Sequence, residues 1–231
     1  MTIYEQLVHK IEKGSIKAGE CLPSESKLMS HYQVSRDTVR KALSLLEYNN
    51  YIIKQRGKES IVNNVNKFNF PLSSITTFSE LVDQQKLNVK TIVEDLSIVV
   101  GDQEIMDILQ ISESDEVYRV KRIREIDGEK VILDKDFFLK SAVPYLSREI
   151  CKKSIYQYLE NELKLKISTA KKIITVNKIS KEDKLLLDLK DENYIVVVKS
   201  FTKLDDGTLF QYTESHHRID KFQFVEYLAR R

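Results

Sequence analysis

One segment near the N-terminus constrains the fold more than any other part of the chain. Residues 35–48 read SRDTVRKALSLLEY, with apolar residues at helical spacing behind a serine at a preferred N-cap position. Asparagines at 49 and 50 are expected to end this helix, because Asn tolerates the left-handed conformation that often follows a helix. An amphipathic helix of this kind cannot bury its apolar stripe alone and must pack on neighbouring elements.

The flanking sequence supplies those elements. A helix is predicted over residues 3–13 and another from Glu25 to Tyr32, with a tight turn at 33–34. Two short strands, 51–53 and 60–62, flank a glycine-containing turn with basic residues at 55–58. The order of helix, turn, capped helix and basic-tipped hairpin predicts a winged helix-turn-helix over residues 2–62.

The third helix also carries the residues expected to read DNA. Arg36 and Arg40 are four residues apart and share a face opposite the apolar stripe. An exposed helix face with arginines suits the major groove, where Arg can bind guanine O6 and N7. The alternative interpretation of one arginine pair is a solvated charged surface, and the surrounding arrangement argues against it.

At these residues the chain resembles the GntR family of bacterial transcription regulators. The matching stretches are 22–25 (LPSE), 35–43 (SRDTVRKAL), 51–52 (YI) and 56–58 (RGK). Asn50 and Glu59 stand where many members have glycine, and Glu59 makes the wing tip less basic. The resemblance implies that the DNA contacts come from Ser24, Ser26, Ser35, Arg36, Asp37, Thr38, Arg40, Arg56, Gly57 and Lys58.

The rest of the chain has a different character. The Asn-rich stretch 63–70 is interpreted as a linker, which gives a DNA-binding domain over 1–66 and a second domain over 67–231. Hairpin turns at 127–128 and 205–208 separate long strands and short helices, so the second domain is expected to be α+β with a mostly antiparallel sheet. The predicted helices are 78–85, 103–109, 155–163 and 181–187, and the predicted strands are 89–100, 116–126, 130–138, 167–176, 194–202 and 208–218.

Two arginines on one face of a strand form the most unusual pattern in this domain. Arg122 and Arg124 lie at alternate positions of one strand and share a face with apolar neighbours, so both point to the same side of the sheet. Buried guanidinium groups require anions, and either Asp134 and Asp136 or an anionic ligand could supply them. A strict two-residue turn at 127–128 would place Arg122 opposite Leu133, and a bulge would be needed to bring Asp134 to the arginine face.

Residues 70–231 resemble the effector domain of the HutC-type branch of the same family, known as the UTRA domain, which has the chorismate-lyase-like fold. Stretches such as 121–138 and 209–220 are similar to those of trehalose-operon regulators. The resemblance implies a homodimeric repressor that trehalose 6-phosphate releases from operator DNA, with another sugar phosphate such as glucosamine 6-phosphate as the alternative. The effector-binding positions that it implies are Phe78, Ser79, Arg122, Arg124, Asp134, Ser154, Tyr156, Gln211 and His217.

Other classes of protein find less support. The two cysteines are far apart, and His216 and His217 point to opposite faces of a strand, so neither pair predicts a metal site. The lyase-like domain allows an enzyme as an alternative, but no nucleophile–base arrangement accompanies it, and no cofactor is expected. Residues 1–66 hold 10 Lys and Arg against 7 Asp and Glu, a small basic excess of +3. With no signal peptide and no long apolar stretch, a cytoplasmic protein is expected.

Overall fold

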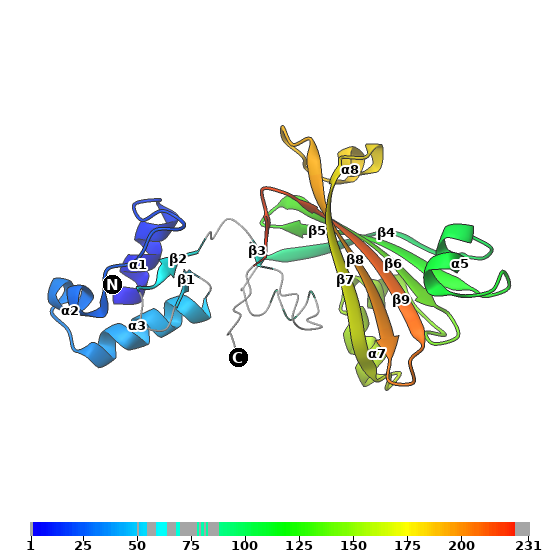
Figure 1. Ribbon diagram of the computed structural model, residues 1–231, viewed down its shortest axis with the longest axis horizontal. Helices are drawn as coiled ribbons and strands as arrows, with labels where there is room; N and C mark the ends of the chain where they lie inside the picture. The colour runs from blue at the N-terminus through cyan, green and yellow to red at the C-terminus, as the bar shows by residue number, and fades with distance from the viewer. Residues whose placement is uncertain are drawn as a thin grey trace. The chain divides into compact units, whose positions relative to one another are not determined.

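A computed structural model describes residues 2–49, 51–54, 59–63, 68–69, 78, 80, 82 and 88–224. The described residues fall into two compact units, with the division after Phe68. Each unit has its own hydrophobic core. Figure 1 labels the helices and strands of both units.

The first unit is a three-helix bundle with a small hairpin. It contains α1 (Ile3–Glu12), α2 (Glu25–Tyr32), α3 (Arg36–Tyr48), β1 (Ile52–Ile53) and β2 (Ile61–Val62). Serine and threonine side chains cap the starts of all three helices, and the predicted cap at Ser35 is confirmed. The predicted apolar stripe of α3 is buried and consists of Val39, Ala42, Leu43 and Leu46. The helical elements and the antiparallel pairing of β1 with β2 confirm the winged helix-turn-helix fold.

The predicted end of α3 is right in position. Asn49 caps the helix with φ of −90°, which is outside the left-handed region, and Asn50, the other residue expected there, lies outside the described residues. A left-handed cap ends α2 at Gln33, in the turn before α3, where φ is 53°.

The second unit is built on a six-stranded antiparallel sheet with the order β4-β5-β6-β9-β8-β7. The predicted strands are present with small changes at their ends, and so are the predicted helices α5, α7 and α8. The remaining helix, α6, was not predicted, and the helix predicted over 78–85 lies mostly outside the described residues. The elements are β4 (Val89–Val99), α5 (Gln103–Leu109), β5 (Val117–Ile126), β6 (Glu129–Leu139), α6 (Arg148–Lys152), α7 (Ile155–Asn161), β7 (Ile167–Lys178), α8 (Lys181–Leu186), β8 (Tyr194–Leu204) and β9 (Leu209–Arg218), and a second small sheet pairs β10 (Phe222–Gln223) with β3 (Phe68–Asn69).

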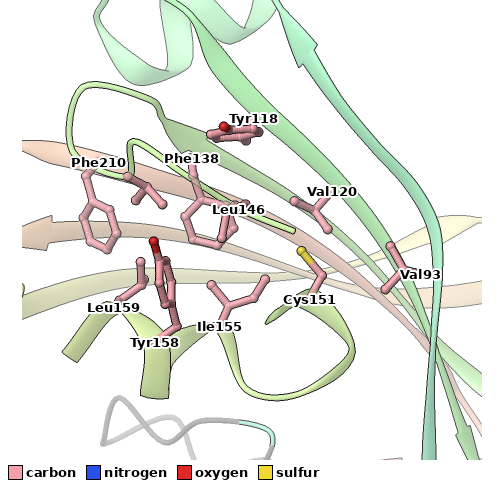
Figure 2. Close-up of a cluster of buried hydrophobic side chains, with 11 residues drawn as sticks. Val93, Tyr118, Val120, Phe138, Leu146, Cys151, Ile155, Tyr158, Leu159 and Phe210 are labelled. Carbon is pink, nitrogen blue, oxygen red and sulfur yellow. The ribbon is translucent and has the colours of Figure 1, made fainter. Parts of the chain in front are cut away.

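Helices cover both faces of the six-stranded sheet. On one face, which we call the inner face, α6 and α7 pack over a cluster that includes Val120, Phe138, Cys151 and Leu159, all of them buried (Figure 2). On the other face, which we call the outer face, α5 packs beside Tyr212, and α8 lies near β6. This arrangement of a mostly antiparallel sheet with helices on both sides confirms the predicted α+β class.

A β-bulge in the β5–β6 hairpin sets which side chains reach the inner face. Asp127 and Gly128 form the predicted two-residue turn, with φ of 52° and 84°. The pairing then skips one residue of β6, so that Glu125 pairs with Lys130 while Arg124 pairs with Ile132. Arg122 therefore lies opposite Asp134, where an uninterrupted hairpin would have placed Leu133.

Candidate DNA-binding and effector-binding sites

The exposed face of α3 presents the predicted DNA-reading arginines. The side chains of Arg36 and Arg40 are 67% and 62% exposed. Both reach back to one carboxylate of α2, because Arg36 Nε donates to Glu25 Oε2 at 3.0 Å and Arg40 Nε donates to Glu25 Oε1 at 3.3 Å. The hydrogen bond from Arg36 is the largest cause of a lowered pKa at Glu25. Glu25 thus holds the two arginines side by side on the surface.

Among the other predicted DNA-contacting positions of α2 and α3, some are helix N-caps and the others are exposed side chains. Ser24 and Ser35 accept hydrogen bonds from the backbone amides of Lys27 and Thr38, which fixes the starts of α2 and α3. Ser26 is exposed, and Asp37 forms an exposed ion pair with Lys41 one helical turn later. The wing residues Arg56, Gly57 and Lys58 lie outside the described residues.

An open groove of about 710 Å³ lies between the start of α2, the exposed face of α3 and strand β2. Arg36, Arg40 and Lys54 bring positive charge to it, and Glu25 and Glu59 bring negative charge. Lys54 also joins the hairpin to α3 through Ser44, at 3.0 Å, and Glu47, at 2.9 Å. No local sequence pattern indicates the pairing of Glu25 with the arginines, because the partners are 11 and 15 residues apart.

The inner face of the sheet brings together most of the predicted effector-binding residues. Arg122 and Arg124 are almost completely buried, with side chains 9% and 5% exposed. Arg122 Nη2 donates to Asp136 Oδ2 at 2.7 Å, and Arg124 Nε donates to Asp134 Oδ2 at 2.8 Å. The structure thus contains the internal carboxylate pairing that the sequence left as one of two alternatives.

The arginines keep some capacity for a further anion. Arg122 Nε is buried and has no hydrogen-bond partner among the described residues. Arg124 Nη1 donates to Thr91 Oγ1 at 2.8 Å, and its guanidinium lies 4.4 Å from the ring centre of Phe78. Burial lowers the pKa of Arg124, and the second cation at Arg122 lowers it further, so an additional anion would be electrostatically favourable here.

The carboxylate of Asp134 is held in the charged form. Burial would raise the pKa of Asp134, but Arg124 and Arg122 overcome this effect and lower it to about 2. Ser215 Oγ also donates to Asp134 Oδ1 at 2.6 Å. Asp136, which the sequence did not single out as a binding residue, accepts from Thr213 Oγ1 at 2.9 Å as well as from Arg122.

A chain of hydrogen bonds extends from this ionic cluster to helix α7. Gln211 Nε2 donates to Asp136 Oδ1 at 3.3 Å, and Gln211 Oε1 accepts from the Tyr156 hydroxyl at 2.7 Å. Burial raises the pKa of Tyr156 to about 12, so its hydroxyl remains a donor at neutral pH. Ser154 caps α7 by accepting from the amide of Gln157 at 3.3 Å. Ligand at the arginines would therefore be linked to α7 through Asp136 and Gln211.

His217, one of the predicted effector positions, has a looser connection to the cluster than the residues above. His217 lies on the inner face opposite Ile132, its ring centre 5.2 Å from that of Phe222, and burial lowers its pKa to about 4. It is therefore a neutral imidazole near neutral pH. Ser79 lies outside the described residues.

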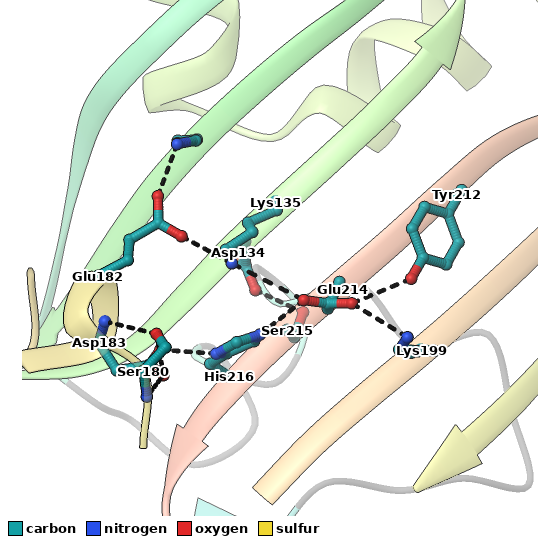
Figure 3. A network of polar contacts seen from close by, with 11 residues as sticks. Asp134, Lys135, Ser180, Glu182, Asp183, Lys199, Tyr212, Glu214, Ser215 and His216 are labelled. Atoms are coloured by element: carbon teal, nitrogen blue, oxygen red, sulfur yellow. Dashed lines mark hydrogen bonds and ion pairs between the residues drawn. The ribbon is translucent and has the colours of Figure 1, made fainter. Parts of the chain in front are cut away.

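The outer face carries a second polar network, which the sequence analysis missed (Figure 3). His216 Nδ1 lies 2.6 Å from Asp183 Oδ1 on α8, and His216 Nε2 lies 2.8 Å from Glu214 Oε1. Glu182 on the same helix pairs with Lys121 at 2.6 Å and Lys135 at 2.7 Å. These contacts attach α8 to β5, β6 and β9. No cluster of His, Cys, Asp or Glu suited to a metal ion occurs among the described residues, and no described helix is long and apolar enough to span a membrane.

Comparison with known proteins identifies both units. Residues 1–62 match the family of bacterial regulatory proteins called gntR, and residues 84–223 match the UTRA domain. The chain belongs to the GntR family of transcription regulators, and it is a regulator rather than an enzyme.

Among individual relatives, the chain is 46% identical to the HTH-type transcriptional regulator TreR of Bacillus subtilis over 230 residues, which cover 100% of this chain and 97% of TreR. The effector-binding domain of the B. subtilis trehalose repressor matches with a TM-score of 0.58 and 46% identity over 61% of this chain and 98% of that structure. The B. subtilis regulator YydK matches with a TM-score of 0.62 and 28% identity, over 99% of this chain and 100% of that structure.

Proposed function

We propose that this chain is a homodimeric cytoplasmic repressor of a trehalose utilisation operon, and that trehalose 6-phosphate releases it from operator DNA. The observation that carries the proposal is the buried pair Arg122 and Arg124, with Nε of Arg122 lacking a hydrogen-bond partner among the described residues. The 46% identity with TreR over the whole chain supports the choice of sugar. Two such chains would present two α3 helices to a palindromic operator.

Helix α3 would make the main contacts with operator DNA. Arg36, Thr38 and Arg40 would contact base edges or phosphates, and Glu25 would keep the arginines in one orientation before DNA arrives. Because both arginines are largely exposed, they can leave Glu25 for DNA at little cost in free energy. Ser24, Ser26, Ser35, Asp37 and the wing residues 56–58 would add contacts to the backbone.

Effector binding would depend on competition between the phosphate of the ligand and the two aspartates for the buried arginines. A phosphate group would take hydrogen bonds from Arg122 and Arg124, which Asp136 and Asp134 now hold. Helix and loop amides at Phe78 and Ser79 would meet the phosphate, while Asp134, Ser154, Tyr156, Gln211 and His217 would surround the sugar. Binding would favour a second arrangement of the two DNA-binding units that no longer fits the operator.

A thermal-shift panel tests the ligand. The full-length protein is heated with trehalose 6-phosphate, trehalose, glucose 6-phosphate or glucosamine 6-phosphate at equal concentrations, since a ligand of the native state raises the melting temperature. We expect the largest rise with trehalose 6-phosphate and almost none with trehalose. A larger rise with glucosamine 6-phosphate would assign the protein to a different sugar phosphate, and no rise with any phosphate would reject an anion site at the arginines.

A further inference from the structure

The inner face of the sheet carries a row of polar side chains that runs beyond the cluster at the arginines. In the strand pairing, Asp136 of β6 lies opposite Thr213 of β9, Thr213 lies opposite Ser200 of β8, and Ser200 lies opposite Lys172 of β7. Directly opposite residues of an antiparallel sheet point to the same side. The row therefore ends at the edge strand β7 with a cation that the effector-binding positions above do not include (Figure 1).

Lys172 differs from the other residues of β7 that share its face. Its inner-face neighbours along the strand are Ala170 and Ile174, so it is the charged member of that stretch. The side chain is half-buried, and burial lowers its pKa. A partly desolvated ammonium group is a strong donor to a ligand hydroxyl, because a charge-assisted hydrogen bond gains strength where water is excluded.

The distance along the row fits a ligand longer than one sugar ring. Neighbouring strands are about 4.8 Å apart, so Lys172 lies about 14 Å from Asp136 and about 19 Å from β5, measured at the backbone. Arginine and lysine side chains each reach several ångströms over the sheet. A phosphate at Arg122 and Arg124 would therefore place the first ring over Asp134 and Asp136, and a second ring over Ser200.

We propose that Lys172 is a specificity-determining residue that donates to the unphosphorylated ring of a disaccharide phosphate, with Ser200 beside it. This inference rests on the proposed function, because it assumes that the arginines bind the phosphate. It identifies β7 as the part of the site that distinguishes a disaccharide phosphate from a monosaccharide phosphate.

The chain offers a matched control in the next residue. Lys171 lies on the opposite face of β7, where it is exposed and its Nζ is 5.8 Å from the ring centre of Phe201. Full-length wild type, Lys172→Ala and Lys171→Ala are titrated with trehalose 6-phosphate and with glucose 6-phosphate by isothermal calorimetry. We expect Lys172→Ala to lower the affinity for trehalose 6-phosphate by about 10- to 100-fold, as for the loss of a charged hydrogen bond. The affinity for glucose 6-phosphate should change by less than about twofold.

The outcomes separate this inference from the proposed function. If Lys172→Ala lowers the affinity for both ligands equally, Lys172 contacts the phosphate and the inference is overturned. Unchanged affinity for trehalose 6-phosphate would overturn it as well. An equal effect of Lys171→Ala would show that a surface charge on β7, and not a contact, is responsible. If wild type binds neither ligand, the proposed function fails, and this inference fails with it.

Discussion

The chain contains two arginine pairs that are built from the same kinds of residue and differ in burial. Arg36 and Arg40 are spaced four apart on a helix, are largely exposed and share one glutamate. Arg122 and Arg124 are spaced two apart on a strand, are almost completely buried and have one aspartate each. An exposed ion pair contributes little free energy and exchanges partners easily, whereas a buried pair is costly to separate unless a new anion replaces the old one. The first pair is thus suited to a large polyanion at the surface and the second to a small anion that is enclosed.

Arg122→Ala gives the largest expected effect on stability. The substitution leaves the buried Asp136 without its cation, and breaking a buried pair in this way costs about 3–5 kcal/mol in the free energy of unfolding. Urea denaturation of the full-length protein, monitored by far-UV circular dichroism, measures it. A loss below about 1 kcal/mol would mean that water reaches Asp136 and that the two arginine pairs do not differ in burial.

Arg36→Ala is expected to have the opposite profile. Because the side chain is 67% exposed, the free energy of unfolding should change by less than about 1 kcal/mol. Operator affinity should fall by about 1–3 kcal/mol, with relaxed preference at one base pair, since a bidentate contact with guanine is lost. Fluorescence anisotropy with operator and mismatched duplexes checks both, and an unchanged affinity would remove Arg36 from the proposed readers.

The two neighbouring histidines should give pH dependences of opposite sign. Burial would lower the pKa of His216, but hydrogen bonds with Asp183 and Glu214 raise it above its usual value of 6.5. Its contribution to stability is fully present below pH 6.5 and is lost as the pH rises through the raised pKa. The pKa of His217 is lowered to about 4, so its contribution is present above pH 6.5 and is lost as the pH falls toward 4.

Thermal unfolding between pH 4 and pH 9 tests this contrast. His216→Gln should flatten the decline above pH 6.5, and His217→Gln should flatten the decline below it. The two variants serve as controls for each other, because they are adjacent residues of β9 on opposite faces of the sheet. Identical pH profiles in the two variants would contradict the assigned environments.

Glu25→Gln is expected to change DNA selectivity by a smaller amount. The substitution removes the carboxylate that holds Arg36 and Arg40, so both side chains become free to bind any phosphate. Affinity for non-operator DNA should rise by a few fold, which reduces the ratio of specific to non-specific binding. Lys41→Ala is the matched control, because the exposed pair with Asp37 contributes less than about 0.5 kcal/mol to stability.

The two regions also differ in how far the sequence predicts them. In the first unit, caps and apolar spacing predict all three helices, because these signals act within one or two helical turns. In the second unit, the strands follow from alternation. Arg122 lies opposite Asp134 only because the pairing of β5 with β6 skips a residue of β6, and no local signal marks that bulge. Helix α6 is short and has no clear periodicity. Partners far apart in the chain, such as Glu25 with Arg40 and Asp183 with His216, depend on packing that the sequence alone does not specify.

Ligand-dependent release of DNA tests most directly whether the buried arginines receive the effector. An operator duplex is first selected from a random library by the full-length protein, and its anisotropy is then followed as trehalose 6-phosphate is added to wild type, Arg124→Lys and Arg40→Lys. Wild type should release the duplex, whereas Arg124→Lys should bind the duplex normally and need far more ligand, because lysine cannot make bidentate contacts with a phosphate. Arg40→Lys should bind the duplex more weakly and respond to ligand at the wild-type concentration. Release of Arg124→Lys at the wild-type ligand concentration would show that the buried arginines do not receive the effector.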